Sequence, residues 1–237
     1  MSPKRPADTA SARRVAPAGL LAGAPYLASP EAPLLEEIAR SAVRRRFEPG
    51  QVVFIEGEPA AGLCFVESGW LKSVKVSPAG REQVLRVVGP GEVFNEVGVF
   101  VGTANPVTVV ALEEATLWII ERQTMLRLVD QRPELARLVI QNLAERALYL
   151  VALVEDLSLR TVEARLARLI LQRSREGTLE RKRWATQAEM ASRLGTVPDV
   201  LQRALRNLVD EGLIEVERQR IRILNRKGLK AKAQLEA

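Results

Sequence analysis

Residues 186–205 read TQAEMASRLGTVPDVLQRAL, and this stretch predicts two short helices joined by a tight turn. Thr186 is a capping residue and Glu189 follows three positions later, which is the spacing of a capping box at a helix start. Gly195 can adopt the left-handed conformation that ends a helix, and Pro198 suits the first turn of the next one. The pattern is typical of a helix-turn-helix, whose second helix enters the major groove of DNA.

The residues around this motif predict a winged helix-turn-helix domain over residues 158–237. We expect helices at Thr161–Arg175, Gln187–Arg193 and Pro198–Glu211, and a hairpin of Ile214–Val216 and Ile221–Ile223. Residues 158–237 carry 18 Lys and Arg against 10 Asp and Glu, whereas residues 1–157 carry 17 against 19. Since neutralised phosphates supply much of the affinity for DNA, the basic excess fits a polyanion partner, although solvated surface charge alone could produce it.

Short β-rich runs separated by glycine and proline predict an antiparallel β-roll over residues 29–132. The runs are Val52–Ile55, Cys64–Glu67, Leu71–Val76, Val84–Val88, Val107–Ala111 and Thr116–Ile120. A helix start at Ser29-Pro30-Glu31 precedes them, after a flexible tail over residues 1–28 that is rich in Ala, Pro, Ser and Arg. The fold class is therefore α+β.

A long helical pattern over residues 133–157 links the two domains. Its apolar residues lie almost all round the helix, so it needs cover on several sides. We expect one side to pack on the β-roll and another to meet a second copy of the chain in a parallel coiled coil. The expected dimer contacts are Val139, Leu143, Leu150, Val154 and Leu157. Burial of this helix within one subunit is the alternative.

Composition excludes several kinds of chemistry. The chain has no histidine and a single cysteine, so His-ligated zinc, haem and an iron–sulfur cluster within one chain are not expected. Cys64 lies in an apolar run, which favours a buried hydrophobic residue over a redox sensor. We expect no metal and no catalytic residues, since paired carboxylates and a phosphate-binding loop are also missing. Without an apolar run long enough for a bilayer or a signal peptide, we expect a cytoplasmic protein that is not an enzyme.

The order and spacing of several short sequence motifs resemble those of the CRP/FNR family, the relatives of cyclic-AMP receptor protein and the fumarate–nitrate regulator. The motifs are Phe47–Gly50, Val66–Gly69, Gly89–Phe100, the helix-turn-helix itself and Leu208–Ile214. The resemblance runs from about Glu31 to the end of the chain. It implies a cyclic-nucleotide-binding-type β-roll (a jelly roll), a dimerisation helix and a homodimeric transcription regulator that binds double-stranded DNA and acts on RNA polymerase.

The resemblance assigns the base-reading residues, with one departure. Family members commonly start the recognition helix with Arg and Glu and place a second Arg four residues later; here these are Pro198, Asp199 and Arg203. Because arginine pairs bidentately with guanine, proline removes one base contact, and the operator should differ from the usual one. We expect Arg203 to read bases with help from Asp199 and Gln202. The candidates for phosphate contacts are Thr186, Arg206, Arg218, Arg220 and Arg222.

The effector pocket departs further from the family pattern. Glu96 is retained, but Asn95 replaces glycine, and Asn105-Pro106 aligns with the arginine-serine pair that holds the cyclic phosphate. Neither residue supplies the countercharge that a buried phosphate needs. The adenine contacts align with Leu150 and Val151, so the whole candidate pocket, vestigial or remodelled, is Asn95, Glu96, Val97, Gly98, Asn105, Pro106, Leu150 and Val151.

Two interpretations of the pocket remain open: an uncharged or apolar effector, or no effector at all. In either case we do not expect control by cyclic AMP. An effector-binding barrel that controls a partner protein rather than DNA is the alternative function.

Overall fold

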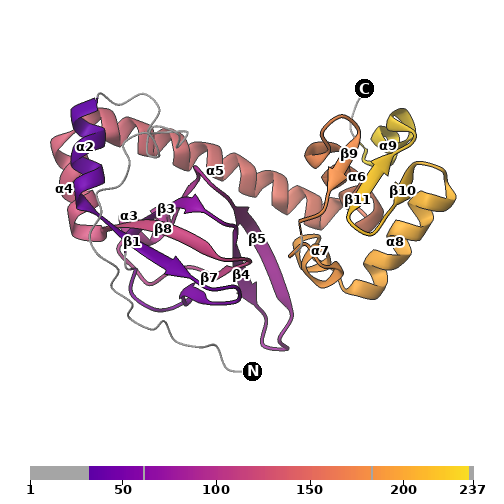
Figure 1. The fold of residues 1–237 in the computed structure, drawn as a ribbon, viewed down its shortest axis with the longest axis horizontal. Coiled ribbons are helices and arrows are strands. Elements are labelled where there is room, and N and C mark those ends of the chain that lie inside the picture. The colour runs from indigo at the N-terminus through magenta and orange to yellow at the C-terminus, as the bar shows by residue number, and fades with distance from the viewer. Residues whose placement is uncertain (1–31, 61, 183, 235–237) are drawn as a thin grey trace. The chain divides into compact units, whose positions relative to one another are not determined.

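A computed structural model of the chain describes residues 32–60, 62–182 and 184–234 (Figure 1). The tail expected over residues 1–28 and the helix start expected at Ser29-Pro30-Glu31 lie outside these residues. The chain divides into two compact units, Met1–Ala79 with Leu85–Leu148, and Gly80–Val84 with Tyr149–Ala237. None of the helices in the described part of the chain combines the length and the hydrophobicity of a transmembrane segment.

The N-terminal unit is built on two four-stranded sheets. The strands are β1 (Ala42–Phe47), β2 (Val52–Phe54), β3 (Gly62–Ser68), β4 (Leu71–Val76), β5 (Glu82–Val88), β6 (Val93–Phe94), β7 (Thr108–Ala111) and β8 (Ala115–Glu121). One sheet has the order β1-β8-β3-β6 and the other β2-β7-β4-β5. Strand β8 pairs antiparallel with β1 and β3, and β7 pairs antiparallel with β2 and β4. Non-consecutive neighbours in both sheets are typical of a roll rather than a meander.

Strand β3 shows why the first sheet is covered on both faces. Successive side chains of a strand point to opposite faces. Leu63 and Phe65 belong to one buried cluster, and Cys64 and Val66 belong to another. The second cluster lies between the two sheets, since Phe54 of β2 and Leu71 of β4 join it.

The first cluster lies between this sheet and helices. These helices are α2 (Ala32–Ser41), α4 (Arg122–Gln131) and the first turns of α5 (Pro133–Leu159), while the short α3 (Glu96–Val101) follows β6. Ile38, Leu128, Leu135 and Val139 bring their helices onto the sheet, and all four are buried. Val139, which the sequence assigned to a dimer contact, is thus 5% exposed and covered by its own subunit, and Leu143 packs against the same cluster.

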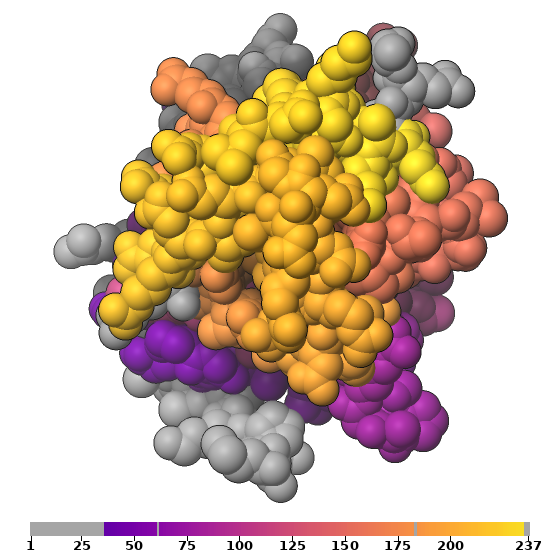
Figure 2. Space-filling model, turned by 90° about the vertical axis from the view of Figure 1, so that its right-hand side faces the viewer, coloured from indigo at the N-terminus to yellow at the C-terminus, as the bar shows by residue number. Residues whose placement is uncertain are grey.

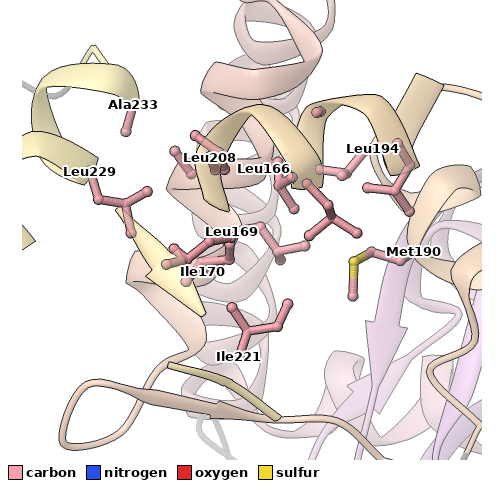
Figure 3. Packing of buried hydrophobic residues seen from close by; sticks show 14 of the residues in the cluster. Leu166, Leu169, Ile170, Met190, Leu194, Leu208, Ile221, Leu229 and Ala233 are labelled. Atoms are coloured by element: carbon pink, nitrogen blue, oxygen red, sulfur yellow. The ribbon is translucent and has the colours of Figure 1, made fainter. Parts of the chain in front are cut away.

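The C-terminal unit packs helices against a small sheet. Its elements are α6 (Val162–Arg173), β9 (Thr178–Glu180), α7 (Gln187–Arg193), α8 (Pro198–Asp210), β10 (Ile214–Val216), β11 (Arg220–Ile223) and α9 (Arg226–Lys232). Figure 3 shows buried side chains from α6, α7, α8, β11 and α9 pointing toward one another in one core. The expected hairpin is part of a three-stranded sheet of order β10-β11-β9, because Leu179 of β9 pairs with Ile221.

A cluster of charged side chains closes this unit at the end of α5. Asp156 Oδ1 lies 2.9 Å from Arg160 Nε and 3.3 Å from Arg168 Nη1. Arg160 Nη1 also donates hydrogen bonds to the carbonyl oxygens of Ala233 (3.0 Å) and Gln234 (3.1 Å). The Arg160 guanidinium therefore joins the end of α5 to the last described residues, and the Asp156 carboxylate joins α5 to Arg168 of α6.

Candidate nucleic-acid interface

Helix α7 has the bounds that its sequence predicts, but only the Thr186 half of the expected capping box is formed, since the Thr186 amide donates to the Trp184 carbonyl at 2.8 Å. The Thr186 hydroxyl oxygen accepts a hydrogen bond from the Glu189 amide at 3.2 Å, which satisfies a free donor of the first turn. Met190 and Ala191 face the core. Gly195 has φ of +66°, a conformation that side chains disfavour, and the chain turns there toward α8.

Helix α8 has one buried and one exposed side. Leu201, Ala204, Leu205 and Leu208 are buried at helical spacing. The opposite side carries the exposed residues Pro198, Asp199, Gln202, Arg203 and Arg206. Figure 2 shows α8 and the segments that follow it, in gold and yellow, on the surface of the C-terminal unit that faces the viewer.

The two arginines of this surface are available to a partner. Within the described ranges, neither Arg203 nor Arg206 makes an ion pair or a hydrogen bond through its guanidinium group. The C-terminal half of the helix is anchored instead, because Asn207 donates a hydrogen bond to Glu163 of α6. Lys232 of α9 pairs with both Glu163 (3.3 Å) and Glu211 (2.5 Å).

Glu163 and Arg165 of α6 both make polar contacts with the helix-turn-helix. The hydrogen bond from Asn207 and the nearby Lys232 hold the pKa of Glu163 below its ordinary value. Arg165 donates a hydrogen bond to the Leu194 carbonyl at the end of α7, and burial lowers its pKa. The helix-turn-helix is thus fixed to α6 by polar contacts as well as by the apolar core.

The three wing arginines are not equivalent. Arg220 pairs with Glu217 at 2.8 Å, which raises the pKa of Arg220, and Arg222 pairs with Glu215. Arg218 lies in the connection between β10 and β11, is exposed and has no such partner among the described residues. Of the three phosphate candidates, Arg218 is therefore the one whose charge is not already balanced.

The candidate effector residues of the N-terminal unit form a second, contrasting cluster. Glu96 and Asn105 are each 2% exposed. Asn95 has φ of +75°, and its Nδ2 donates to the Gly62 carbonyl at 2.9 Å. Asn105 Nδ2 donates to the carbonyls of Ile55 (3.3 Å) and Pro59 (3.5 Å).

This cluster is rich in oxygen atoms and poor in cations. A Cβ added at Gly98 would lie 2.7 Å from Asn95 Oδ1 and 3.3 Å from Asn105 Oδ1, so the two amide oxygens converge there. Among the described residues, Glu96 Oε1 and Asn105 Oδ1 have no hydrogen-bond partner. Burial raises the pKa of the Glu96 carboxyl, while its own amide, Arg146 and Arg86 lower it to a smaller extent.

Most of the remaining candidate residues of the pocket and of the interface are exposed, although Gly98 is buried. Val97 is 38% exposed, and Pro106 is also exposed. Leu150 and Val151 belong to the C-terminal unit and lie on the exposed side of α5, as does Val154, while Leu157 is half-buried. Cys64 is buried, and burial raises the pKa of its thiol, which fits the interpretation of a buried hydrophobic residue.

Both units match known families. The Cyclic nucleotide-binding domain family matches residues 44–132, and the Crp-like helix-turn-helix domain family matches residues 164–232. The fold is similar to the solved structure of FixK2 from Bradyrhizobium japonicum, with a TM-score of 0.73 at 20% identity over 83% of this chain and 99% of that one. The predicted α+β architecture is confirmed.

Two curated relatives extend the similarity over most of the sequence. A probable transcriptional regulator, flp, of Lacticaseibacillus casei is 32% identical over 201 residues, which cover 81% of this chain and 90% of flp. The CRP-like cAMP-activated global transcriptional regulator of Mycobacterium tuberculosis is 26% identical over 84% of this chain and 94% of its own length. This chain therefore belongs to the CRP/FNR family of DNA-binding transcription regulators.

Proposed function

We propose that the protein binds a two-fold-symmetric operator as a homodimer and that α8 of each subunit enters the major groove of one half-site. The observation that supports this is the division of α8 into a buried apolar side and an exposed side with two arginines that have no ion-pair partner among residues 32–60, 62–182 and 184–234. Arg203 pairs with guanine, with Asp199 and Gln202 beside it, and Arg206 contacts phosphate. Arg218 and the Thr186 hydroxyl are further phosphate contacts.

Selection of bound fragments from a random DNA pool tests this function. The expected product is an inverted repeat whose half-sites lie about one helical turn apart. A salt-dependent gel shift on the selected duplex then gives the affinity, with a scrambled duplex as the control. Recovery of no common sequence would contradict the proposed function and favour the alternative, a module that controls a partner protein.

The exposed residues of α5 support the homodimer. Ile140, Ala144, Ala147, Val151, Val154 and Ser158 recur at alternating spacings of four and three, and each of them is exposed. Such a stripe is the seam of a two-stranded coiled coil, and its small residues let the helices approach closely. Since Val139 and Leu143 pack within the subunit, this neighbouring stripe replaces them in the proposed interface.

A charged pair of substitutions tests the seam. Val151→Glu combined with Val154→Glu places like charges across the interface and should convert the dimer to a monomer in light scattering. Leu159→Glu is the matched control, because Leu159 is 76% exposed on the same helix but lies outside the stripe. A dimer that survives the double substitution would refute this interface.

We also propose that cyclic AMP is not the effector. The position aligned with the phosphate-binding arginine is Asn105, and its side-chain amide already donates hydrogen bonds to two backbone carbonyls. Arg86, one of the two arginines whose charge acts on Glu96, already pairs with Glu92 at 2.8 Å and donates to the Val93 carbonyl at 3.2 Å. A buried cyclic phosphate would therefore find no countercharge from residue 105 or from Arg86.

Thermal unfolding with added cyclic AMP tests this part. We expect no shift of the melting temperature at concentrations that stabilise the Mycobacterium tuberculosis relative, which is named as cAMP-activated. A shift of several degrees would show that the pocket accepts the nucleotide without an arginine at position 105. Transcription in vitro with purified RNA polymerase, on a template that carries the selected operator, then gives the sign of regulation.

A further inference from the structure

The residue that starts helix α8 is an exception within its domain. The N-cap residues of helices α6, α7 and α9, which directly precede the first helical residue, are Thr161, Thr186 and Asn225, and each side chain accepts a hydrogen bond from an amide of the first turn. The N-cap residue of helix α8 is Val197, whose side chain makes no such bond. An oxygen-bearing residue at this position stabilises a helix by about 1 kcal/mol. The recognition helix lacks the cap that its three neighbours have.

Packing does not account for Val197 either. The side chain is 48% exposed, and it is neither in the buried cluster of the C-terminal unit nor among the hydrophobic residues packed against it. Leu201 and Leu208 supply the core contacts of the same helix and are each 0% exposed. A residue that breaks a local rule without a structural gain marks a functional position.

The neighbours of Val197 make the start of α8 apolar. Pro198 is exposed at the first helical position and carries no amide proton. The start of α8 therefore presents a valine and a proline, while the polar residues Asp199, Gln202 and Arg203 follow. In this class of motif, the first residues of the second helix meet the edges of the bases.

We propose that Val197 is a specificity-determining residue that contacts the C5-methyl group of a thymine in each half-site, with Pro198 beside it. The thymine methyl is the one apolar group on the base edges of the major groove, so an apolar side chain held there selects it. This inference rests on the proposed function. It predicts that each half-site of the operator contains a thymine at the position that Val197 meets.

Deoxyuridine tests the contact because it removes the methyl group and leaves the pairing unchanged. Each thymine of the selected operator is replaced in turn, symmetrically in both half-sites. At one position we expect wild-type binding to weaken about fourfold for each half-site, which is the effect of one buried methylene-sized group. Val197→Ser should abolish this difference and should fold well, because serine is a capping residue.

Val209→Ser is the matched control, since Val209 is 40% exposed on the same helix but lies at its C-terminal end. This variant should keep the wild-type response to deoxyuridine. Specific binding without a deoxyuridine effect at any position, or a Val197→Ser variant that keeps the effect, would overturn the assignment and leave the proposed function intact. A wild-type protein without sequence-specific binding would overturn both.

Discussion

The polar side chains on the exposed side of α8 and those in the cluster around Glu96 differ in exposure and in the partners that they have within the protein. Arg203 and Arg206 are exposed and have no ion-pair partner in the described part of the chain, whereas the Asn95 and Asn105 amides donate to backbone carbonyls of their own unit. A surface with unsatisfied cations is prepared for an anionic partner of large size. A buried cluster whose two side-chain amides already donate to backbone carbonyls, and whose spare side-chain atoms are oxygens, is poorly suited to a small anion. This difference between the two regions supports both proposals, binding of DNA by α8 and no control by cyclic AMP.

The largest effect is expected from Arg203→Ala. Loss of a bidentate arginine–guanine contact costs about 1–3 kcal/mol in discrimination, or roughly 5- to 150-fold for each half-site. The measurement is the ratio of dissociation constants for the selected and scrambled duplexes. Arg226→Ala, at an exposed position of α9, is the control and should leave this ratio unchanged. An unchanged ratio for Arg203→Ala would remove Arg203 from base reading.

A second prediction concerns the buried cluster around Glu96, where a substitution should raise the free energy of unfolding. Because the pKa of Glu96 is raised by burial, its neutral form is favoured in the folded state. The contribution of Glu96 to stability is therefore full below about pH 4.3, the ordinary pKa, and is lost as the pH rises through the raised value. Glu96→Gln imitates the neutral acid and should be more stable than the wild type at pH 7, by about 1.4 kcal/mol for each unit of the shift.

Chemical denaturation of both proteins between pH 4 and pH 8 measures this difference. It should disappear toward pH 4, where the wild-type carboxyl is also neutral. Glu121→Gln is the control, since Glu121 is exposed at the end of β8 and should show no comparable gain. A Glu96→Gln variant that is less stable at pH 7 would mean that the carboxylate is stabilised in the folded protein.

The smallest expected effect distinguishes two arginines of the wing. Arg218→Ala should weaken binding to selected and scrambled duplexes equally and lower the slope of log K against log salt by about 0.9 for each subunit. Arg222→Ala should change the slope less, because Arg222 already pairs with Glu215. Equal slopes for the two variants would indicate that the ion pair opens on DNA.

The sequence predicted the elements whose signals are local. The capping residue Thr186, the turn at Gly195 and the start of α8 at Pro198 are each specified by neighbouring residues, and the structure has all three. Strand β9 was missed because it is not part of a local hairpin, as the equally short β10 is, and becomes a strand through its pairing with β11. Helix α4 was missed because it follows β8 directly, and only Met125 and Leu128 of its ten residues are buried.

Periodicity alone could not separate the partners of α5. Val139 and Ile140 are adjacent apolar residues of one helix, yet the first is 5% and the second 67% exposed. Which of them meets the β-roll depends on the position of a sheet that is far away in sequence. The same limit applies to the pocket: the loss of the arginine at position 105 is visible in the sequence, but the hydrogen bonds of Asn105 to Ile55 and Pro59 are not.

The contacts of Arg160 determine where the C-terminal unit can be cut out for separate study. A fragment that begins at Val162, the first residue of α6, would discard Arg160 and Asp156 and leave Arg168 without its carboxylate. It would also free the carbonyls of Ala233 and Gln234 at the other end of the chain. A fragment that starts at Tyr149 and ends after Gln234 keeps the whole set. The bounds of the excised domain should therefore include every partner of Arg160 and Asp156, even where these lie outside the helix boundaries.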